Sequence, residues 1–517
     1  MRASSNAVDC LVIGAGHNGL VCAAVLARAG RSVLVLEAGQ TIGGASVTRE
    51  FAPGFRVSAG AHLLHSMPAT LRHELRLEQH GLIAAATRMP TTALLEHAPP
   101  LAVEAWACGV ESEARAAFDA RMRRVARALA PIIERRPPRI GSGGMRDVLE
   151  WLRSALRLRL LGRRDLRELL RVGGMNVYDL LEEQFESVAL QGALALDAVL
   201  GSNFGPRSPG TVFTLLYRMA GQELALAEGT ELPRGGMGAV CAALAAAATA
   251  AGAAVRTGAP VARIVIDADR ASGVELADGE RIAARTVISS ADPKTTLLRL
   301  VGPRHLDAGF VRRVDRLRGR GLAAKLHLAL DRAPAFTGLE PGRLGSRLLI
   351  APSMAYVERA FDHSKYGEFA PEPVMEITVP SAVDPTLAPQ GRHVLSAVVQ
   401  YAPYELKGGW SDGRAGAIER LLGMLERHAP GLRDSVVGAE LLAPPDIERE
   451  FRIDGGHWHH AELAFDQFHL LRPVPGASGH RLDIPGLYLC GAGCHPGGGV
   501  IGLAGRNAAR CLLEHGE

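Results

Sequence analysis

Residues 7–37 read AVDCLVIGAGHNGLVCAAVLARAGRSVLVLE, and this stretch decides the fold. Its apolar run Val8–Ile13 predicts a buried strand, residues 18–29 predict a helix that ends at Gly30, and residues 32–36 predict a second strand. A strand, a glycine-rich turn, a helix and a second strand in this order are typical of the βαβ unit of a Rossmann-type domain. The sequence therefore predicts an α/β fold that binds a dinucleotide.

Three glycines and an acid carry this prediction. Gly14 permits the tight turn, Gly16 leaves room for a pyrophosphate, and Gly19 lets the helix approach the strand closely. Glu37 follows the second strand, where a carboxylate can accept hydrogen bonds from an adenosine ribose. Together they indicate one binding unit.

The segments after Glu37 extend this site. Gly43 and Gly44 indicate backbone that closes over the cofactor, and Arg49 is placed to meet a phosphate or a ring oxygen. Small residues at 58–61, followed by His62, would let a flat ring lie against the chain.

The composition is that of an ordinary globular protein. A chain of 517 residues is too long for one compact core, so we expect two or more domains. The formal net charge of +4 does not suggest nucleic-acid binding, and no purely apolar run reaches the length of a membrane span. The seven cysteines include no CxxC motif and indicate a reducing compartment. We therefore expect a cytoplasmic protein.

An arginine-rich helical region breaks this pattern. Residues 115–171 hold sixteen arginines and six acidic residues, interleaved with Trp151 and several leucines. One interpretation is a solvated helical face. The other is a basic amphipathic surface that rests on anionic lipid at the inner face of a membrane, or that shields a channel for an apolar substrate.

The middle of the chain first returns to the opening pattern. Residues 232–252 read as a glycine turn and an alanine-rich helix, and short strands with tight turns between 255 and 290 predict a small antiparallel layer on the dinucleotide-binding domain. Farther on, residues 322–330 (LAAKLHLAL) alternate, so Lys325 and His327 should share one face of a strand.

Two clusters remain near the C-terminus. Residues 455–462 (GGHWHHAE) hold four groups able to bind a metal, but no matching ligand set occurs elsewhere, so we expect no metal site. Residues 491–499 form a second glycine-rich loop between an apparent strand at 487–490 and a helix at 500–513. The N-terminus of that helix would stabilise negative charge on a reduced flavin ring.

These segments carry a resemblance that covers essentially the whole chain. It rests on VIGAGHNGLVCAAVLARAG, GGASVTREFAPGF, LPRGGMGAV, RTVISSADP and LYLCGAGCHPGGGVIGLAGRNAA, and GGHWHHAELAFDQFHLLRP makes it specific. Together they resemble the phytoene-desaturase-like branch of the FAD-dependent amine-oxidase superfamily. The sequence departs from the pattern of this family in two places. Gly491-Ala492 replaces the usual glycine–aspartate pair, and no redox cysteine pair is present.

The resemblance implies FAD as the cofactor and a set of residues around it. Lys325 looks like the lysine that bridges through water to flavin N5, and His62, His460 and Glu462 are further catalytic candidates. The candidate cofactor-binding residues are Gly14, Ala15, Gly16, His17, Asn18, Gly19, Glu37, Ala38, Gly43, Gly44, Arg49, Gly60, Ala61, Val261, Gly491, Ala492, Gly498, Gly499 and Val500.

The resemblance also implies a divided architecture. We predict a Rossmann-type FAD-binding domain with an extra antiparallel layer, assembled from residues 1–72, 228–295 and 471–517. An inserted mixed α+β substrate domain with a helical, arginine-rich part would comprise residues 73–227 and 296–470.

Three functions fit this sequence. The first is an FAD-dependent desaturase or dehydrogenase that transfers hydride between a small apolar substrate, polyene or lipid-like, and flavin N5. The second is an amine or amino-acid oxidase, although aromatic residues make up only 5% of the chain and an aromatic cage is therefore doubtful. The third is a flavin-binding regulatory protein with little turnover. The sequence contains no second GxGxxG unit with its own acid, so it does not predict a separate nicotinamide site. Oxygen or a quinone is therefore the expected electron acceptor.

Overall fold

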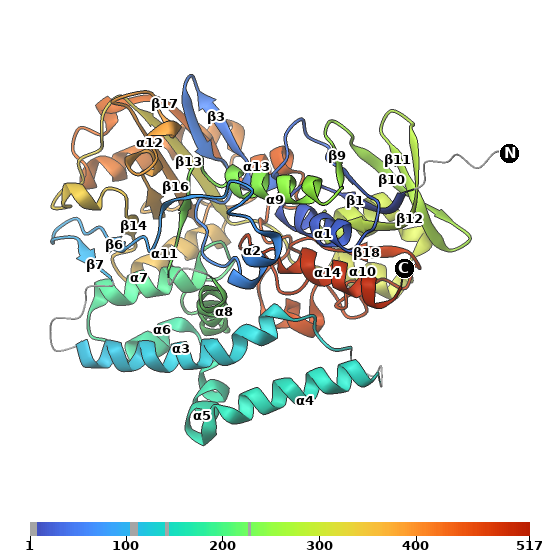
Figure 1. Cartoon of the computed structure of the whole chain (residues 1–517). Helices are drawn as coiled ribbons and strands as arrows, with labels where there is room; N and C mark the ends of the chain where they lie inside the picture. Colours follow the sequence, from blue (N-terminus) through green and yellow to red (C-terminus); the bar gives the residue numbers. More distant parts are fainter. Residues whose placement is uncertain (1–7, 104–111, 140–143, 226–228, 517) are drawn as a thin grey trace.

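The computed structural model describes residues 8–103, 112–139, 144–225 and 229–516. These residues form two seven-stranded sheets that lie side by side, with a helical part below them (Figure 1). The first sheet has the strand order β10-β11-β12-β1-β2-β9, with β18 also paired to β12. The second has the order β17-β13-β16-β15-β14-β6-β7. The predicted α/β class is confirmed.

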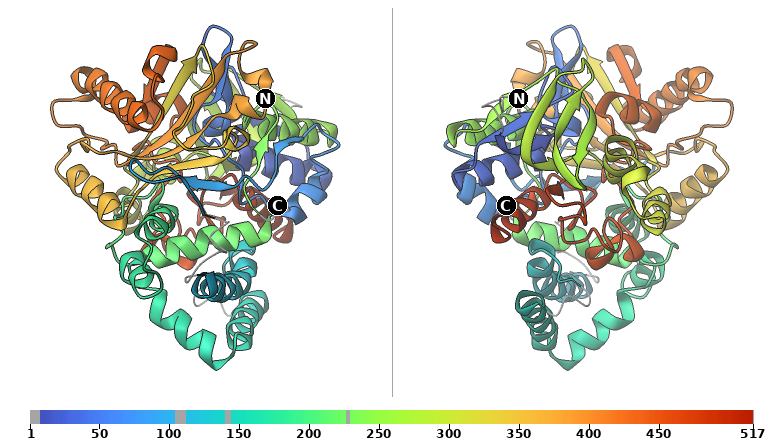
Figure 2. Two further views of the ribbon diagram at one scale, coloured as in Figure 1. Left: turned by 90° about the vertical axis from the view of Figure 1, so that its left-hand side faces the viewer. Right: turned by 90° about the vertical axis from the view of Figure 1, so that its right-hand side faces the viewer.

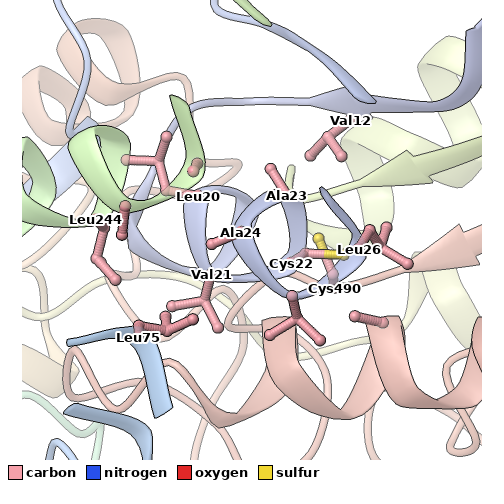
Figure 3. Packing of buried hydrophobic residues seen from close by; sticks show 14 of the residues in the cluster. Val12, Leu20, Val21, Cys22, Ala23, Ala24, Leu26, Leu75, Leu244 and Cys490 are labelled. Carbon is pink, nitrogen blue, oxygen red and sulfur yellow. The ribbon is translucent and has the colours of Figure 1, made fainter. Parts of the chain in front are cut away.

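The opening unit forms almost as the sequence predicts. Strand β1 is Val8–Ile13, helix α1 is His17–Arg28 and strand β2 is Val33–Leu36, so each boundary lies within one residue of the prediction. The two strands pair in parallel. Helix α1 is buried along almost its whole length between neighbouring helices, as the packing of its Leu20, Val21 and Leu26 shows (Figure 3).

Distant segments complete the first sheet. Strand β12 (Arg281–Ser289) pairs in parallel with β1 and antiparallel with β11 (Arg270–Leu276), so one long strand joins the parallel core to the predicted antiparallel layer. Strand β18 (Leu487–Leu489) pairs in parallel with the other side of β12, and helix α14 (Leu503–Glu514) packs on α1. The chain therefore returns to its starting sheet at its C-terminal end.

The second sheet is built around β13 (Ala323–Leu330), which pairs with β16 (His393–Gln400) and β17 (Val436–Leu442). The predicted alternation is confirmed: Leu326, Leu328 and Leu330 enter an apolar core, whereas Lys325 and His327 both contact Ser396 on the other side. Every residue of β13 is buried.

The arginine-rich region forms α3 (Ser112–Glu134), α4 (Met145–Leu160) and α5 (Gly162–Val172). Helix α3 packs on α8 (Thr211–Leu224), whereas α4 and α5 project from the body of the molecule (Figures 1 and 2). Within the described residues, no helix is both long enough and apolar enough to cross a bilayer.

The remaining elements fill the two layers around these sheets. They are β3 (Thr48–Ala52), β4 (Phe55–Ser58), α2 (Ala69–Leu75), β5 (Ala84–Ala86), β6 (Thr91–Ala93), β7 (Leu101–Ala102), α6 (Val177–Glu182), α7 (Val188–Val199), β8 (Leu232–Pro233), α9 (Gly238–Ala250), β9 (Ala254–Arg256), β10 (Val261–Asp267), α10 (Ala308–Asp315), β14 (Arg347–Ile350), α11 (Met354–Lys365), β15 (Val374–Thr378), α12 (Trp410–His428) and α13 (Pro444–Phe451). The exact domain boundaries stay predictions.

Candidate functional site

A cavity of about 360 Å³ is lined by residues of both sheets. The ends of β1 and β2 contribute Ile13 and Leu36, and the second sheet contributes Glu376 and Val398. Ligands of Rossmann-type sheets bind at the carboxyl ends of such strands. Fifteen candidate cofactor residues line this cavity: Gly14, Gly16, His17, Asn18, Glu37, Ala38, Gly43, Gly44, Gly60, Ala61, Val261, Ala492, Gly498, Gly499 and Val500.

The glycine turn has the geometry that a pyrophosphate needs. Gly14 has a φ of +96°, and a Cβ added to Gly19 would lie 2.0 Å from the carbonyl oxygen of Gly14. A Cβ added to Gly16 would meet nothing within 4 Å, so this side of the turn is open. His17 Nε2 and Asn18 Oδ1 are buried beside it without a hydrogen-bond partner among the described residues. The open turn fits a bound phosphate group because it leads into the N-terminus of α1, where backbone N–H groups have no partner within the helix. The unpaired oxygen of Asn18 is an acceptor and would need an O–H or N–H group of a ligand.

Glu37 is held at the adjacent wall. Its carboxylate accepts hydrogen bonds from the backbone N–H of Ala15 at 2.7 Å and of Gly39 at 2.8 Å. The carboxylate is thereby fixed at the cavity, as binding of an adenosine ribose requires.

The opposite end of the cavity is lined by Gly498, Gly499 and Val500. Tyr217 donates its hydroxyl hydrogen bond to the Gly498 carbonyl at 3.0 Å, and a Cβ on Gly498 would lie 2.0 Å from His459 Nδ1. A flat ring system fits such glycine-lined backbone.

Helix α14 begins later than the sequence predicts. It starts at Leu503 rather than Val500, because Gly499, Val500 and Gly502 all have positive φ values, which a right-handed helix excludes. No residue of α14 lines the cavity. The loop before α14, and not the first turn of the helix as predicted, therefore lines the cavity.

Arg49 does not reach the cavity. Its guanidinium forms ion pairs with Glu440 at 3.0 Å and with Glu450 at 2.6 Å, and it ties β3 to β17 and α13. The prediction that Arg49 meets the cofactor is therefore corrected. Its guanidinium is instead paired with two carboxylates from the second half of the chain. Ala15, Gly19 and Gly491 also lie outside the lining and support the loops that form it.

Lys325 lies behind the cavity wall rather than on it. Its side chain is fully buried, and Nζ contacts His62 Nδ1 and Ser396 Oγ, both at 2.9 Å. His62 does line the cavity, and its Nε2 lies 2.8 Å from Glu376 Oε1. Lysine, histidine and glutamate thus form a continuous buried network.

Two arginines extend this network. Arg347 is buried and pairs with both Glu376 and Asp197, the latter at 2.6 Å. Arg218 lines the cavity and lies 3.5 Å from Asp197. Both carboxylates of the network are therefore neutralised by guanidinium groups.

The electrostatics assign protons to the network. Burial lowers the pKa of Lys325 to about 7, and burial together with Lys325 lowers the pKa of His62 to about 4. Burial raises the pKa of Glu376, but Arg347 and His62 outweigh it and hold that pKa well below its ordinary value. Neutral His62 therefore donates from Nε2 to ionised Glu376 and accepts at Nδ1 from Lys325.

Residues 455–462, the histidine segment, contain two of the catalytic candidates, and only one of them lies at the cavity. His460 lines the cavity, and burial lowers its pKa to about 3. Glu462 does not line it: its carboxylate accepts from the backbone N–H of Asn203 at 2.8 Å and of Leu463 at 3.1 Å. The structure therefore places Glu462 as an anchor of this segment, which corrects its prediction as a residue that reaches the reacting atoms.

Arg472 organises the same segment. It is fully buried and donates to five backbone carbonyls, which belong to His459, Ala461, Glu462, Gln467 and Ala492. It thereby joins the histidine segment to the C-terminal glycine loop.

The cysteines of the C-terminal loop are buried and free. Burial raises the pKa of both Cys490 and Cys494, so neither is an activated thiol. Cys108 lies outside the described residues. Among those that are described, no group of three metal-ligating side chains is assembled.

Four charged residues of this network were not identified from the sequence: Glu376, Asp197, Arg218 and Arg347. A signal was present, because Glu376 interrupts the apolar strand VMEIT and Asp197 interrupts the apolar helix VALQGALALDAV. A charged residue inside a buried element requires a partner. Which partner it finds depends on packing between distant elements.

Comparisons with known proteins agree with this geometry. The family model for flavin containing amine oxidoreductases matches residues 19–513. Pyridine nucleotide-disulfide oxidoreductase domain-containing protein 2 of Mus musculus is 35% identical over 98% of this chain and 93% of its own. A lycopene-forming phytoene desaturase of a Paracoccus species is 26% identical over 59% of this chain and 58% of its own.

A solved structure shares the fold. Putrescine oxidase bound to putrescine superposes with a TM-score of 0.62 at 17% identity, over 98% of each chain. The predicted superfamily and FAD as the cofactor are confirmed. With its glycine turn, Glu37 and its C-terminal glycine loop on one cavity, this oxidoreductase belongs to the flavin containing amine oxidoreductase family.

Proposed function

We propose that the protein is an FAD-dependent desaturase or dehydrogenase that acts on a small apolar substrate, polyene or lipid-like. FAD supplies a hydride acceptor when bound. The glycine turn and Glu37 would hold its ADP half, and the loop at Gly498–Val500 would hold its ring. The roles of these residues stay predictions until they are tested.

The pairing of charges at the cavity carries the proposal. Glu376 and Asp197 line the part of the cavity that we assign to the substrate, next to β15 and α7, and Arg347 and Arg218 already neutralise them. A cationic amine would find no free carboxylate there among the described residues. The apolar side chains near them are Leu63, Ala198, Leu200, Tyr217, Val398, Trp458 and Leu463. The histidines that line the cavity with them, His62, His65, His459 and His460, are uncharged at neutral pH because burial lowers the pKa of each. Such a wall favours a substrate that buries C–H surface.

The buried network supplies a place for the proton. In a desaturation the substrate loses a hydride and a proton from neighbouring carbons and gains a double bond. We assign the proton to the pair of His62 and Lys325, because His62 faces the cavity and the pKa of Lys325 is about 7. Glu376 orients His62 through its Nε2–H.

An amine or amino-acid oxidase is the second candidate. Arg218 favours it, since this guanidinium faces the cavity and could pair with the carboxylate of an amino acid. A flavin-binding protein with little turnover is the third. Oxygen or a quinone is the proposed electron acceptor.

Anaerobic flavin bleaching separates the three. The FAD-loaded protein is mixed with polyenes, amines, amino acids and hydroxy acids, and loss of the oxidised flavin band is followed. Bleaching by polyenes alone supports the proposal, whereas bleaching by amines or amino acids refutes it. A yellow protein that none of these compounds bleaches supports the third candidate.

The Lys325→Met variant tests the proton site. We expect unchanged FAD affinity and a rate of flavin reduction lower by about 100-fold, the usual contribution of a positioned acid or base. The rise of the rate around pH 7 should also disappear. His327→Gln is the matched control, because His327 contacts the same Ser396, whereas its other ring nitrogen bonds to the Ala59 carbonyl and not to His62. Equal reduction rates in both variants would contradict the role of Lys325.

A further inference from the structure

A second cavity, of about 400 Å³, is lined by residues from the end of α3, the start of α4 and α14. Figure 1 shows α14, the end of α3 and the start of α4 one above the other in the lower right part of the molecule. The side chains that line the cavity are almost all charged: Glu134, Arg135, Arg136, Arg146, Glu150, Arg153, Arg506, Asn507, Arg510 and Glu514. Six guanidinium groups therefore face three carboxylates.

The carboxylates in this cavity are too few to pair one to one with its guanidinium groups. Glu514 serves both Arg136, at 2.5 Å, and Arg146, at 3.7 Å. Glu150 likewise serves both Arg135, at 3.4 Å, and Arg153, at 2.7 Å. Two carboxylates are thus shared among four guanidinium groups.

Carboxylates from outside the lining do not remove the excess. Glu74 pairs with Arg510 and Asp147 pairs with Arg146, so among the described residues the six arginines of the cavity still outnumber five acids. The described residues therefore give this cavity a net positive charge.

A buried arginine at the base of the cavity has unused capacity. The side chain of Arg506 is only 3% exposed and pairs with Glu134 at 3.1 Å. Its Nε is buried and has no hydrogen-bond partner among the described residues. Burial and the nearby Arg510 lower the pKa of Arg506, as expected where cationic groups are crowded. An oxyanion with several acceptor oxygens would satisfy such a cluster.

The helix that lines this cavity also carries an exposed apolar stripe. Met145, Leu149, Leu152, Leu156 and Leu160 follow at intervals of three or four residues, so they share one face of α4. They are 85%, 42%, 62%, 58% and 75% exposed.

The cationic and apolar faces of α4 lie next to each other. Arg146, Glu150 and Arg153 each follow a stripe residue by one position, about 100° around the helix. A ligand that carries a phosphate and a hydrocarbon chain could therefore contact both faces at once.

We propose that this cavity, the α4 arginine site, binds the phosphate of an anionic phospholipid while the apolar stripe of α4 enters the acyl boundary of the bilayer. Complementary charge favours this occupant, and the adjacent stripe distinguishes a lipid from a free phosphate. Helix α4 would then lie in the plane of the membrane surface and hold the enzyme there. The proposal is independent of the substrate of the flavin site.

Vesicle flotation of the FAD-loaded full chain tests the proposal. We expect the protein to float with vesicles that contain phosphatidylglycerol and to stay at the bottom with pure phosphatidylcholine. The Arg146→Gln/Arg153→Gln variant should bind roughly 25-fold more weakly, about fivefold for each arginine. The Arg281→Gln/Arg285→Gln variant is the matched control on β12 and should bind like the original protein. Equal binding of both variants would refute the site.

A second arm separates the lipid from a soluble phosphate. Calorimetry with glycerol phosphate should detect weak binding that Arg146→Gln/Arg153→Gln abolishes. The Leu152→Asp/Leu156→Asp variant should retain this binding but lose flotation by at least about tenfold. Tyr366→Asp, at an exposed site on another helix, is its control. Binding of glycerol phosphate without any flotation would overturn the lipid proposal, as would flotation that both leucine substitutions leave unchanged.

Folding controls keep the outcome interpretable. Arg146, Arg153, Leu152 and Leu156 have side chains at least 37% exposed, so their substitution should leave the far-ultraviolet spectrum and the flavin absorbance unchanged. Only variants that pass both checks enter the comparison.

Discussion

At the scale of single residues, Gly16 and Gly19 differ in the reason why a side chain is excluded at each position. Gly16 has an extended backbone that any residue can adopt, and its missing side chain leaves open space at the cavity. Gly19 has no such space, because a Cβ there would lie 2.0 Å from a backbone oxygen. One glycine is thus predicted to serve the ligand and the other the packing.

This difference can be measured. We expect Gly16→Val to weaken FAD binding by at least about 100-fold, because a side chain there would keep the phosphate away from the hydrogen-bond donors of the turn. Its melting temperature without FAD should stay within a few degrees of the original. Gly19→Val should instead fail to fold or melt far lower. An FAD affinity of Gly16→Val within about threefold of the original would refute the assigned phosphate position.

The lowered pKa of Lys325 predicts how the free energy of unfolding depends on pH. Its pKa falls from the ordinary 10.5 to about 7 in the folded protein, so between these values the unfolded chain binds more protons. Stability should therefore rise with pH in this window, by up to about 1.4 kcal/mol per pH unit from this group. Lys325→Met should flatten the rise between pH 7 and 9 and should be more stable than the original near pH 6. Urea unfolding at several pH values checks this, and parallel curves for the two proteins would contradict it.

At the scale of elements, one buried arginine connects loops that lack regular structure. Arg472 donates to five carbonyls, so its removal would leave several buried acceptors unpaired at once. We expect Arg472→Met to lower the free energy of unfolding by about 3–5 kcal/mol. Arg318→Met removes an exposed ion pair with Asp466 and should cost less than about 1 kcal/mol. Similar costs in the two variants would show that Arg472 does not organise the wall.

At the scale of the whole molecule, the cavity is closed by segments from both ends of the chain. Residues near 14, 198, 261, 376 and 498 all line it. Bound FAD should therefore stabilise the entire structure, by about 2.7 kcal/mol at a concentration of 100 times its dissociation constant. We expect one thermal transition that moves upward as a unit. Two transitions, of which only one responds to FAD, would contradict a cavity shared by all these segments.

The sequence alone determined the local features. The strand, turn, helix and acid of residues 8–37 were predictable because Rossmann chemistry is encoded within one short stretch, where glycines and apolar periodicity act on neighbours. The alternation around Lys325 was predictable for the same reason. The start of α14 was not, because apolar residues after Gly499 looked helical although positive φ values exclude a helix there.

Only the tertiary structure decided the partners of charged side chains. Arg49 looked free to meet a phosphate, but β17 and α13 bring Glu440 and Glu450 to it from about four hundred residues away. Likewise, Lys325, His62 and Glu376 come from three separate segments and meet only when the sheets pack. A buried charge is stabilised by whichever opposite charge the fold places beside it, and that distance in space is not written in the spacing along the chain.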